Sequence, residues 1–282
     1  MEDALSADLE GCRYWLMDGI GNAFIIVDLR GGGTLGEDAA RGLAEAAEGV
    51  RIDQVIGLVA EGEGAAMTIF NRDGSVAGAC GNAARCIAWR LMEEQGTDEV
   101  IFGTPAGSVT ATRAGDHRVT VDMGAPRLGW QDIPLAEACE DTRFLDIKVG
   151  PIDNPVLWGP SAVSMGNPHC VFFVEDVAAQ RLDRFGPLIE NHPLFPEGAN
   201  VSVAEVPDPH HIRLRTWERG AGLTQACGTA ACAALVSAVR RRRTGRRADV
   251  TLPGGTLDIS WREADDHVLM TGDIRALRTG RL

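Results

Sequence analysis

The strongest constraint on this 282-residue chain is a short word that occurs twice. Residues 79–84 read Ala-Cys-Gly-Asn-Ala-Ala, and residues 226–231 read Ala-Cys-Gly-Thr-Ala-Ala. The cysteines of the two copies, Cys80 and Cys227, are 147 residues apart, about half the chain. Each copy opens a segment of helical composition that follows a strand-rich segment. The repeat therefore predicts a duplicated domain, with one Cys-Gly helix start in each copy.

The rest of the pattern agrees with two domains of similar build. Short strands separated by turn residues are expected at 14–17, 23–29, 55–59, 67–70, 100–102, 108–112 and 119–123, then at 161–165, 170–174, 212–217, 250–252 and 256–261. Helices are expected at 36–49, 82–94 and 228–243. A stretch rich in turns and charges, 127–155, places the boundary near residues 123–130. We expect two α/β domains, each a mostly antiparallel sheet with one prominent helix.

Composition excludes several classes of protein. The chain has 27 basic and 40 acidic residues, a net charge of −13, which repels phosphate backbones and disfavours nucleic acid as a partner. No stretch approaches the roughly 20 apolar residues of a membrane span. The acidic start lacks the basic-then-apolar pattern of a signal peptide, so we expect a cytoplasmic protein. Seven cysteines, an odd number in a long chain, argue against a disulfide framework.

Metal and cofactor chemistry also fit the sequence poorly. Each repeat carries a second cysteine, Cys86 or Cys232, but at about 100° per helical residue neither pair shares a helix face. Neither pair has the spacing of a zinc site, and no CxxC redox motif is present. The triple glycine 31–33 lacks the spacing of a dinucleotide-binding loop and is read as a loop. We therefore expect no metal and no cofactor.

Their helix positions suggest a chemical role for Cys80 and Cys227. A helix N-terminus favours a thiolate and lowers its pKa from about 8.5, and the following glycines, Gly81 and Gly228, let the backbone approach an anion. The alternative is two small buried residues, since free cysteine is often buried. Two thiols facing each other across a domain cleft would suit inversion of a carbon stereocentre, which needs a base on one face and an acid on the other.

At these residues the sequence resembles the diaminopimelate epimerase family, and the resemblance extends from Asp18 to about Gly280. The segments that carry it are GIGNAFIIVD (19–28), IFNRDGSVAGACGNAARC (69–86), VSMGNPHCV (163–171), ERGAGLTQACGTAACAA (218–234) and LPGGTLDISW (252–261). Asn82 separates the chain from the proline-racemase branch, which usually places His after the first Cys-Gly. The phenazine-biosynthesis relatives share the fold but lack the cysteine pair.

The resemblance implies a fold and a domain division. It implies an α/β chain of the α+β type, with two pseudo-symmetric domains, each a sheet or barrel around a central helix, and an active site in the cleft between them. The expected domains are 1–123, to which the tail 273–282 returns, and 124–272.

The resemblance also implies an activity and a set of site residues. The activity is cofactor-independent interconversion of LL- and meso-2,6-diaminopimelate, in the synthesis of lysine and peptidoglycan precursors. Cys80 and Cys227 would be the acid/base pair, assisted by His169 and Glu218. The amino-acid substrate would be held by Asn22, Gln54, Asn71, Gly81, Asn82, Asn167, Asn200, Glu218, Arg219, Gly228 and Thr229. An arginine fork suits a carboxylate, and amides can orient both polar ends of a zwitterion.

Four positions depart from the family pattern. Asp18 stands where His or Asn is usual, Ala23 replaces an Asp, and Leu223 replaces the Glu of ERGAGET. These three keep open a second hypothesis, racemisation of a different amino acid. Arg278 falls where many members place an aromatic dimer-contact residue, which bears on the homodimer that the family implies.

Two further alternatives come from other features. A redox-responsive binding module, in which Cys80 and Cys227 form a disulfide, is the non-enzymatic hypothesis. The basic run Arg240–Arg243, with Arg246 and Arg247, invites a nucleic-acid interpretation. We expect instead a solvated helix end, where cations offset the C-terminal dipole.

Overall fold

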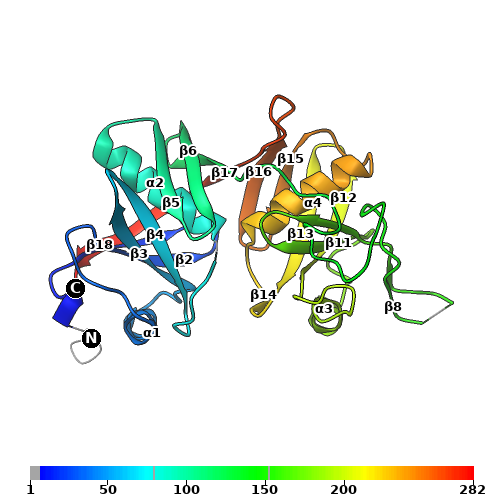
Figure 1. The fold of residues 1–282 in the computed structure, drawn as a ribbon, viewed down its shortest axis with the longest axis horizontal. Coiled ribbons are helices and arrows are strands. Elements are labelled where there is room, and N and C mark those ends of the chain that lie inside the picture. The colour runs from blue at the N-terminus through cyan, green and yellow to red at the C-terminus, as the bar shows by residue number, and fades with distance from the viewer. Residues whose placement is uncertain (1–6, 79, 152) are drawn as a thin grey trace. The chain divides into compact units, whose positions relative to one another are not determined.

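The computed structural model describes residues 7–78, 80–151 and 153–282, and these form an α+β protein of two compact units (Figure 1). One unit contains the residues up to Val121 together with Thr271–Leu282, and the other is Asp122–Met270. Strands predominate, and the described residues hold four α-helices. The expected α+β class is confirmed. None of the described helices combines the length and apolar character needed to cross a bilayer.

The first unit is a curved sheet in which most neighbouring strands are antiparallel. Its strands lie in the order β7-β6-β5-β4-β3-β2-β1-β18, with bounds β1 Arg13–Asp18, β2 Ala23–Asp28, β3 Gln54–Glu61, β4 Gly64–Asn71, β5 Glu99–Thr104, β6 Gly107–Gly115, β7 Arg118–Asp122 and β18 Arg275–Arg281. Its helices are η1 Ala7–Leu9, α1 Glu37–Ala46 and α2 Gly81–Gln95. The pairs β2/β3 and β4/β5 are parallel, because α1 and α2 make the long crossovers that parallel pairing requires.

The second unit repeats this order of elements. Its strands lie in the order β10-β11-β12-β13-β15-β16-β17, with β14 beside β13 and a separate pair β8/β9. The bounds are β8 Lys148–Val149, β9 Leu157–Trp158, β10 Ser161–Ser164, β11 Pro168–Phe173, β12 Asn200–Asp208, β13 His211–Glu218, β14 Gly222–Leu223, β15 Arg247–Leu252, β16 Gly255–Trp261, β17 Val268–Asp273, α3 Leu182–Glu190 and α4 Gly228–Arg240. Here β11/β12 and β13/β15 are parallel across α3 and α4, so the duplication extends from the cysteine word to the topology.

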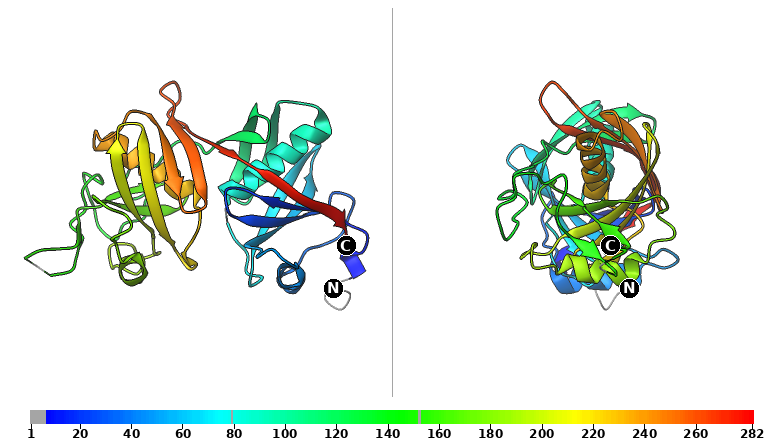
Figure 2. Two further views of the ribbon diagram at one scale, coloured as in Figure 1. Left: turned by 180° about the vertical axis from the view of Figure 1, so that it is seen from behind. Right: turned by 90° about the vertical axis from the view of Figure 1, so that its right-hand side faces the viewer.

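The helix that begins at the repeated word is central to the second unit. Helix α4 reads GTAACAALVSAVR, and all of its residues from Gly228 to Ala238 are buried. A helix that is apolar or small on every side must be enclosed, and α4 packs against β10, β11, β12, β13, β15 and β16 (Figure 2). Its alanines permit close approach to the strands. The start of the helix is thereby held rigidly at one end of the core.

The basic run does not end as expected. Helix α4 stops at Arg240, three residues early, and Arg242 has a positive φ of 57°. The prediction of a solvated helix end is right for Arg242 and Arg243, which are exposed, and wrong for Arg240 and Arg241, which are half-buried. Arg240 donates to Thr142 Oγ1 at 3.0 Å, and Arg241 donates to the carbonyl of Gly159 at 3.0 Å. Arg240 and Arg241 are thus held by oxygen atoms of Thr142 and Gly159 as well as by the helix dipole.

Candidate functional site

Cys80 caps the N-terminus of α2, as the sequence predicts. Its backbone is extended, with φ −152° and ψ 97°, and its Sγ accepts a hydrogen bond from the N–H of Ala83 at 3.4 Å. The side chain is half-buried, and the preceding residue of the repeated word, Ala79, lies outside the described residues. The N–H of Ala83 and the positive end of the helix dipole therefore both act on this sulfur, a setting that stabilises a thiolate.

Four amide residues of the first unit form two hydrogen-bonded pairs. Asn82, in the first turn of α2, donates its Nδ2 to Asn22 Oδ1 at 2.7 Å. Gln54, at the start of β3, donates its Nε2 to Asn71 Oδ1 at 3.1 Å, since the two residues are register partners at the ends of β3 and β4. Asp53 directly precedes Gln54, and its Oδ2 accepts a hydrogen bond from Asn22 Nδ2 at 3.5 Å. Because Gln54 directly follows Asp53 in the chain, the structure places Asn22, Gln54, Asn71 and Asn82 near one another.

Cys227 caps α4 in the same extended conformation but in a different environment. Its φ is −131° and its ψ 108°, and its side chain makes no cap hydrogen bond. The residue is only 6% exposed, and its Sγ lies 3.5 Å from Thr229 Oγ1. Burial and then the nearby charge of Glu218 raise the pKa of this thiol well above its usual range. The expected lowering of the pKa is therefore wrong for Cys227, because burial outweighs the helix dipole.

A chain of hydrogen bonds connects His169 to Cys227. His169 Nε2 lies 2.9 Å from Asn167 Oδ1, Asn167 Nδ2 donates to Thr229 Oγ1 at 3.4 Å, and Thr229 contacts Cys227. His169 is completely buried on β11, and burial, followed by the charge of Arg219, lowers its pKa to about 3. The imidazole is therefore neutral. Among the described residues its Nδ1 has no hydrogen-bond partner, which leaves an acceptor inside the site.

Asn200 joins three strands of the second unit at the other side of His169. It is the register partner of His169, its Nδ2 donates to the carbonyl of Pro168 at 3.1 Å, and its Oδ1 accepts from the N–H of Arg219 at 3.0 Å. Asn200, at the start of β12, thereby links β11 to the end of β13, where Glu218 and Arg219 lie. The expected residues His169, Asn200, Glu218 and Arg219 are brought together.

Helix α3 supports the turn that follows Glu218. Glu190, the last residue of α3, accepts the indole N–H of Trp217 at 2.6 Å through Oε2 and the N–H of Gly220 at 2.8 Å through Oε1. Neither α3 nor this support is predictable from the sequence, because Glu190 lies 28 residues before Glu218 with no motif to connect them.

Sequence reasoning also missed two residues next to the first cysteine. Arg85 is completely buried and donates to Asn82 Oδ1 at 3.0 Å, and Asp53 accepts from Asn22 and from the N–H of Ala23. The available signals were local: Arg85 is three residues after Asn82, the spacing of neighbours on a helix face, and Asp53 directly precedes Gln54.

The structure shows the contacts and exposure of the four residues that depart from the family pattern. Asp18 is buried, accepts from the N–H of Gly21 and pairs with Arg275 at 3.2 Å. Ala23 is buried beside Asp53, and Leu223 is 44% exposed on β14, opposite Trp217. Arg278 lies on β18 opposite Leu16 and is exposed.

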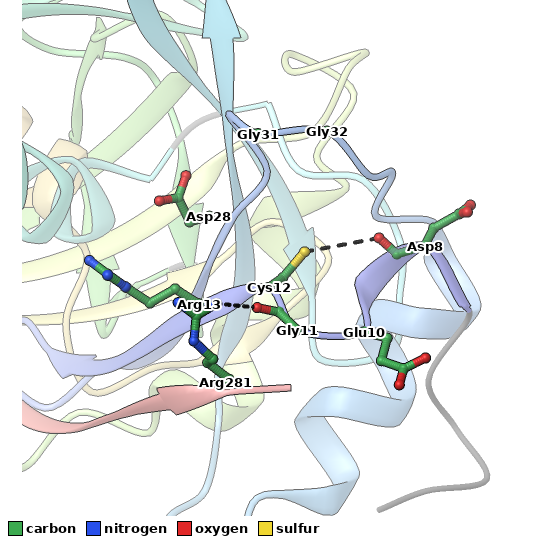
Figure 3. Close-up of a pocket in the computed structure, with 9 residues that line it drawn as sticks. All are labelled: Asp8, Glu10, Gly11, Cys12, Arg13, Asp28, Gly31, Gly32 and Arg281. Carbon is green, nitrogen blue, oxygen red and sulfur yellow. Dashed lines mark hydrogen bonds between the residues drawn. The ribbon is translucent and has the colours of Figure 1, made fainter.

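Two other features of the surface do not coincide with these residues. A hollow of about 480 Å³ in the first unit is lined by Asp8, Glu10, Gly11, Cys12, Arg13, Asp28, Gly31, Gly32 and Arg281, none of which belongs to the expected site (Figure 3). Among the described residues, Asp122, Asp265 and His267 could offer three ligands to a metal ion, but Arg262 already donates to both carboxylates.

Comparisons with known proteins show the family of this chain. The sequence model of diaminopimelate epimerase matches residues 14–129 and 161–277. A diaminopimelate epimerase of Afipia carboxidovorans is 54% identical over 261 residues, 91% of this chain and 90% of that protein. One of Chelativorans sp. is 51% identical over 277 residues, 96% of this chain and 94% of that protein.

Solved structures share the fold at low identity. A predicted epimerase of Pseudomonas aeruginosa has a TM-score of 0.68 at 19% identity, covering 96% of this chain and 99% of that one. A hydroxyproline epimerase of Agrobacterium vitis, solved with bound trans-4-hydroxy-L-proline, has a TM-score of 0.64 at 16% identity, covering 97% and 91%. The two-unit fold is the one that these epimerase structures share. The chain belongs to the diaminopimelate epimerase family.

Proposed function

We propose that this chain is a cofactor-independent isomerase that interconverts LL- and meso-2,6-diaminopimelate, with Cys80 and Cys227 as its acid/base pair. The observation that carries the proposal is the equivalent placement of these cysteines, each the N-cap of the helix that opens at the repeated word. The relatives named above, at 51–54% identity over nearly the full chain, are diaminopimelate epimerases. The role in lysine and peptidoglycan precursor synthesis follows from that substrate.

The two thiols have different resting roles in this proposal. Cys227 keeps its proton at neutral pH because its pKa is raised, so it starts as the acid. Cys80, whose sulfur accepts an N–H, starts as the base. The Cα–H bond of the substrate breaks and its proton moves to the Cys80 sulfur, while the Cys227 S–H bond breaks and its proton adds to the opposite face of the carbon. Cys80 is then the thiol, Cys227 the thiolate, and the reverse reaction restores both.

Backbone donors would bind the carboxylate next to the reacting carbon. The first N–H groups of a helix have no acceptor within the helix, and those of Gly81, Asn82, Gly228 and Thr229 lie at the two helix starts. Binding the carboxylate there lowers the cost of the carbanion, because negative charge is stabilised as it develops. The neutral Nδ1 of His169 can accept an N–H of the substrate's ammonium group, with Glu218 as its charged counterpart.

The remaining polar residues would hold the other end of the substrate. Arg219 carries a guanidinium that suits the second carboxylate, and its backbone is fixed by Asn200. The amides of Gln54 and Asn71 already form a hydrogen-bonded pair, and the amide of Asn167 is held by His169 and Thr229. Preordered groups of this kind bind a zwitterion with little loss of side-chain entropy.

Single serine variants of the two cysteines test the proposal. In Cys80→Ser and Cys227→Ser, loss of an acid or base group should slow epimerisation of LL-diaminopimelate by at least about 100-fold. Exchange of the α-proton in D₂O, followed by NMR, measures the step directly. Cys12→Ser, which changes a half-buried thiol outside the site, is the matched control. Undiminished epimerisation in either variant would contradict the two-cysteine mechanism.

A second candidate is racemisation of a different amino acid by the same two thiols. It is favoured by Leu223, the register partner of Trp217, and by Ala23, which follows Asn22, because both are apolar where the family pattern has carboxylates. A panel of amino acids decides between the candidates: turnover of another amino acid together with rejection of diaminopimelate would select the second.

A homodimer and a cytoplasmic setting belong to the same proposal. The thiols must stay reduced to exchange protons, which a reducing compartment ensures. Light scattering on the eluted protein measures the oligomeric state, and a mass of one chain at all concentrations would remove the dimer from the proposal.

A further inference from the structure

Four side chains of the first unit form a directional row of hydrogen bonds. Arg85 Nη1 donates to Asn82 Oδ1 at 3.0 Å, and Asn82 Nδ2 donates to Asn22 Oδ1 at 2.7 Å. Asn22 Nδ2 then donates to Asp53 Oδ2 at 3.5 Å. The row runs from a cation to an anion through two amides, and we call it the amide relay.

The two ends of the amide relay determine its direction. A guanidinium can only donate and a carboxylate can only accept, whereas an amide can present either atom if it flips. With Arg85 at one end, Asn82 must turn its oxygen toward the helix interior and its nitrogen toward Asn22. With Asp53 at the other end, Asn22 must turn its nitrogen toward the carboxylate. A flip of either amide would place two donors or two acceptors against each other.

The surrounding packing keeps both ends in place. Arg85 is a completely buried residue of α2, where a guanidinium N–H without an acceptor would cost free energy. Asp53 Oδ2 also accepts the N–H of Ala23 at 3.0 Å, and the N–H of Asp53 donates to the carbonyl of Ala23 at 2.9 Å. At Gly19 an added Cβ would lie 3.0 Å from the backbone oxygen of Asn82 and 3.4 Å from Arg85 Nη2, so glycine lets the β1–β2 loop approach α2.

We infer that Arg85 and Asp53 are positioning residues, which fix the amide orientation of Asn22 and Asn82 and thereby decide which atoms those amides turn toward the substrate. The inference rests on the proposed function, in which Asn22 and Asn82 contact the substrate. Neither Arg85 nor Asp53 is proposed to contact the substrate itself. Their effect is on binding, so it should appear in KM more than in kcat.

Kinetics of variants at the two ends of the relay test this effect. In Arg85→Met and in Asp53→Ala, KM for LL-diaminopimelate should rise about three- to tenfold, the value of one or two hydrogen bonds, with kcat within about twofold of the wild type. Arg85→Lys and Asp53→Asn, which keep a donor or an acceptor, should restore part of the loss. Arg90→Met, on the same helix and paired with Glu94, is the matched control and should leave both constants unchanged.

The double variant separates positioning from general destabilisation. Because a break at either end releases the same two amides, Arg85→Met combined with Asp53→Ala should raise KM no further than the larger single change. Independent structural damage would multiply the two effects instead, and that result would overturn the inference. A fall in kcat with unchanged KM would overturn it as well.

A measurement without substrate keeps the inference separate from the proposed function. The side-chain NH₂ groups of Asn22 and Asn82 should exchange slowly with solvent in the wild type and faster in Arg85→Met and Asp53→Ala, as NMR can record. If the wild type fails to epimerise diaminopimelate, the proposed function falls while slow exchange still supports the relay. Unchanged exchange in variants that remain folded would remove the relay itself.

Discussion

Nε2 of His169 lies 2.9 Å from Oδ1 of Asn167, and because an amide oxygen only accepts, this contact places the ring hydrogen of His169 on Nε2. The same amide donates its Nδ2 to Thr229, which holds the orientation of Asn167 in turn. The histidine of the candidate site is thus fixed in one tautomer and kept neutral by burial. Its Nδ1 can accept a hydrogen bond, but the ring cannot serve as a cation near pH 7.

The buried histidine should make the protein sensitive to mild acid. The pKa of His169 is about 3 in the folded chain and about 6.5 in the unfolded chain, so below pH 6.5 only the unfolded chain gains the proton. Stability from this residue is present above pH 6.5 and is lost as the pH falls toward 3. Between pH 7 and pH 5 the wild type should lose about 2 kcal/mol more than His169→Gln in urea unfolding. His211→Gln, at an exposed histidine, is the control; an equal loss in wild type and His169→Gln would contradict the assignment.

A buried thiol should give the opposite dependence in alkali. Burial raises the pKa of Cys86 to about 12, so above about pH 8.5 the unfolded chain loses its thiol proton while the folded chain keeps it. Stability from this group is present below pH 8.5 and is lost as the pH rises toward 12. Between pH 8.5 and 9.5 the wild type should lose about 1 kcal/mol more than Cys86→Ala. Cys12→Ala, at a half-buried thiol, should behave as the wild type does, and a loss in Cys86→Ala equal to that of the wild type would refute the prediction.

Gly186 in α3 leaves room for the indole of Trp217. An added Cβ would meet Cγ, Cδ2 and Cβ of Trp217, so Gly186→Ala should destabilise the protein by about 1–3 kcal/mol through overpacking. Trp217 precedes Glu218, and its displacement should also lower turnover. Chemical unfolding and the epimerisation assay measure the two effects. Gly245→Ala, where an added Cβ meets no atom within 4 Å, is the control. Wild-type stability in Gly186→Ala would show that α3 moves aside without cost.

Arg241 should hold in place the two segments that contain Phe144 and Gly159. Its guanidinium lies 4.0 Å from the ring centre of Phe144 and 5.0 Å from that of Phe173, and it donates to the carbonyl of Gly159. Removing these contacts in Arg241→Ala should cost about 1–3 kcal/mol. Hydrogen exchange should increase at residues 142–149, as mass spectrometry can follow. Arg242→Ala, at an exposed neighbour, should change neither quantity, and unaltered exchange in Arg241→Ala would exclude the role.

Much of the fold follows from local pattern. The strands around the repeated word, and the helix start at Cys80 and at Cys227, are visible in the sequence because hydrophobic periodicity and Cys-Gly mark them directly. Helix α3 was missed, since it is short and holds Pro187 in its interior. The sequence pattern also does not predict strands β12, β17 and β18 or the two-residue strands β8, β9 and β14. In β18 nearly every residue is exposed, so its pairing with β1 leaves no apolar alternation to read.

The site was predictable where motifs carry it and hidden where only the tertiary structure does. His169 and Glu218 could be named from GNPHC and ERGAG, but not that His169 is neutral, because that depends on burial created by strands far away in the sequence. The same holds for the thiol of Cys227. A helix N-terminus alone predicts a lowered pKa, and the enclosure of α4 reverses the sign.

The pairing of β18 with β1, from Arg13 opposite Arg281 to Asp18 opposite Arg275, also dictates an order of assembly during synthesis. All of the second unit is translated between the two strands, from Asp122 to Met270. During synthesis on the ribosome, the first unit therefore cannot be complete until the second unit has been made. The second unit is continuous in sequence and can fold before β18, the partner of β1, has been synthesised. Truncation near the C-terminus should therefore destabilise the first unit before it affects the second.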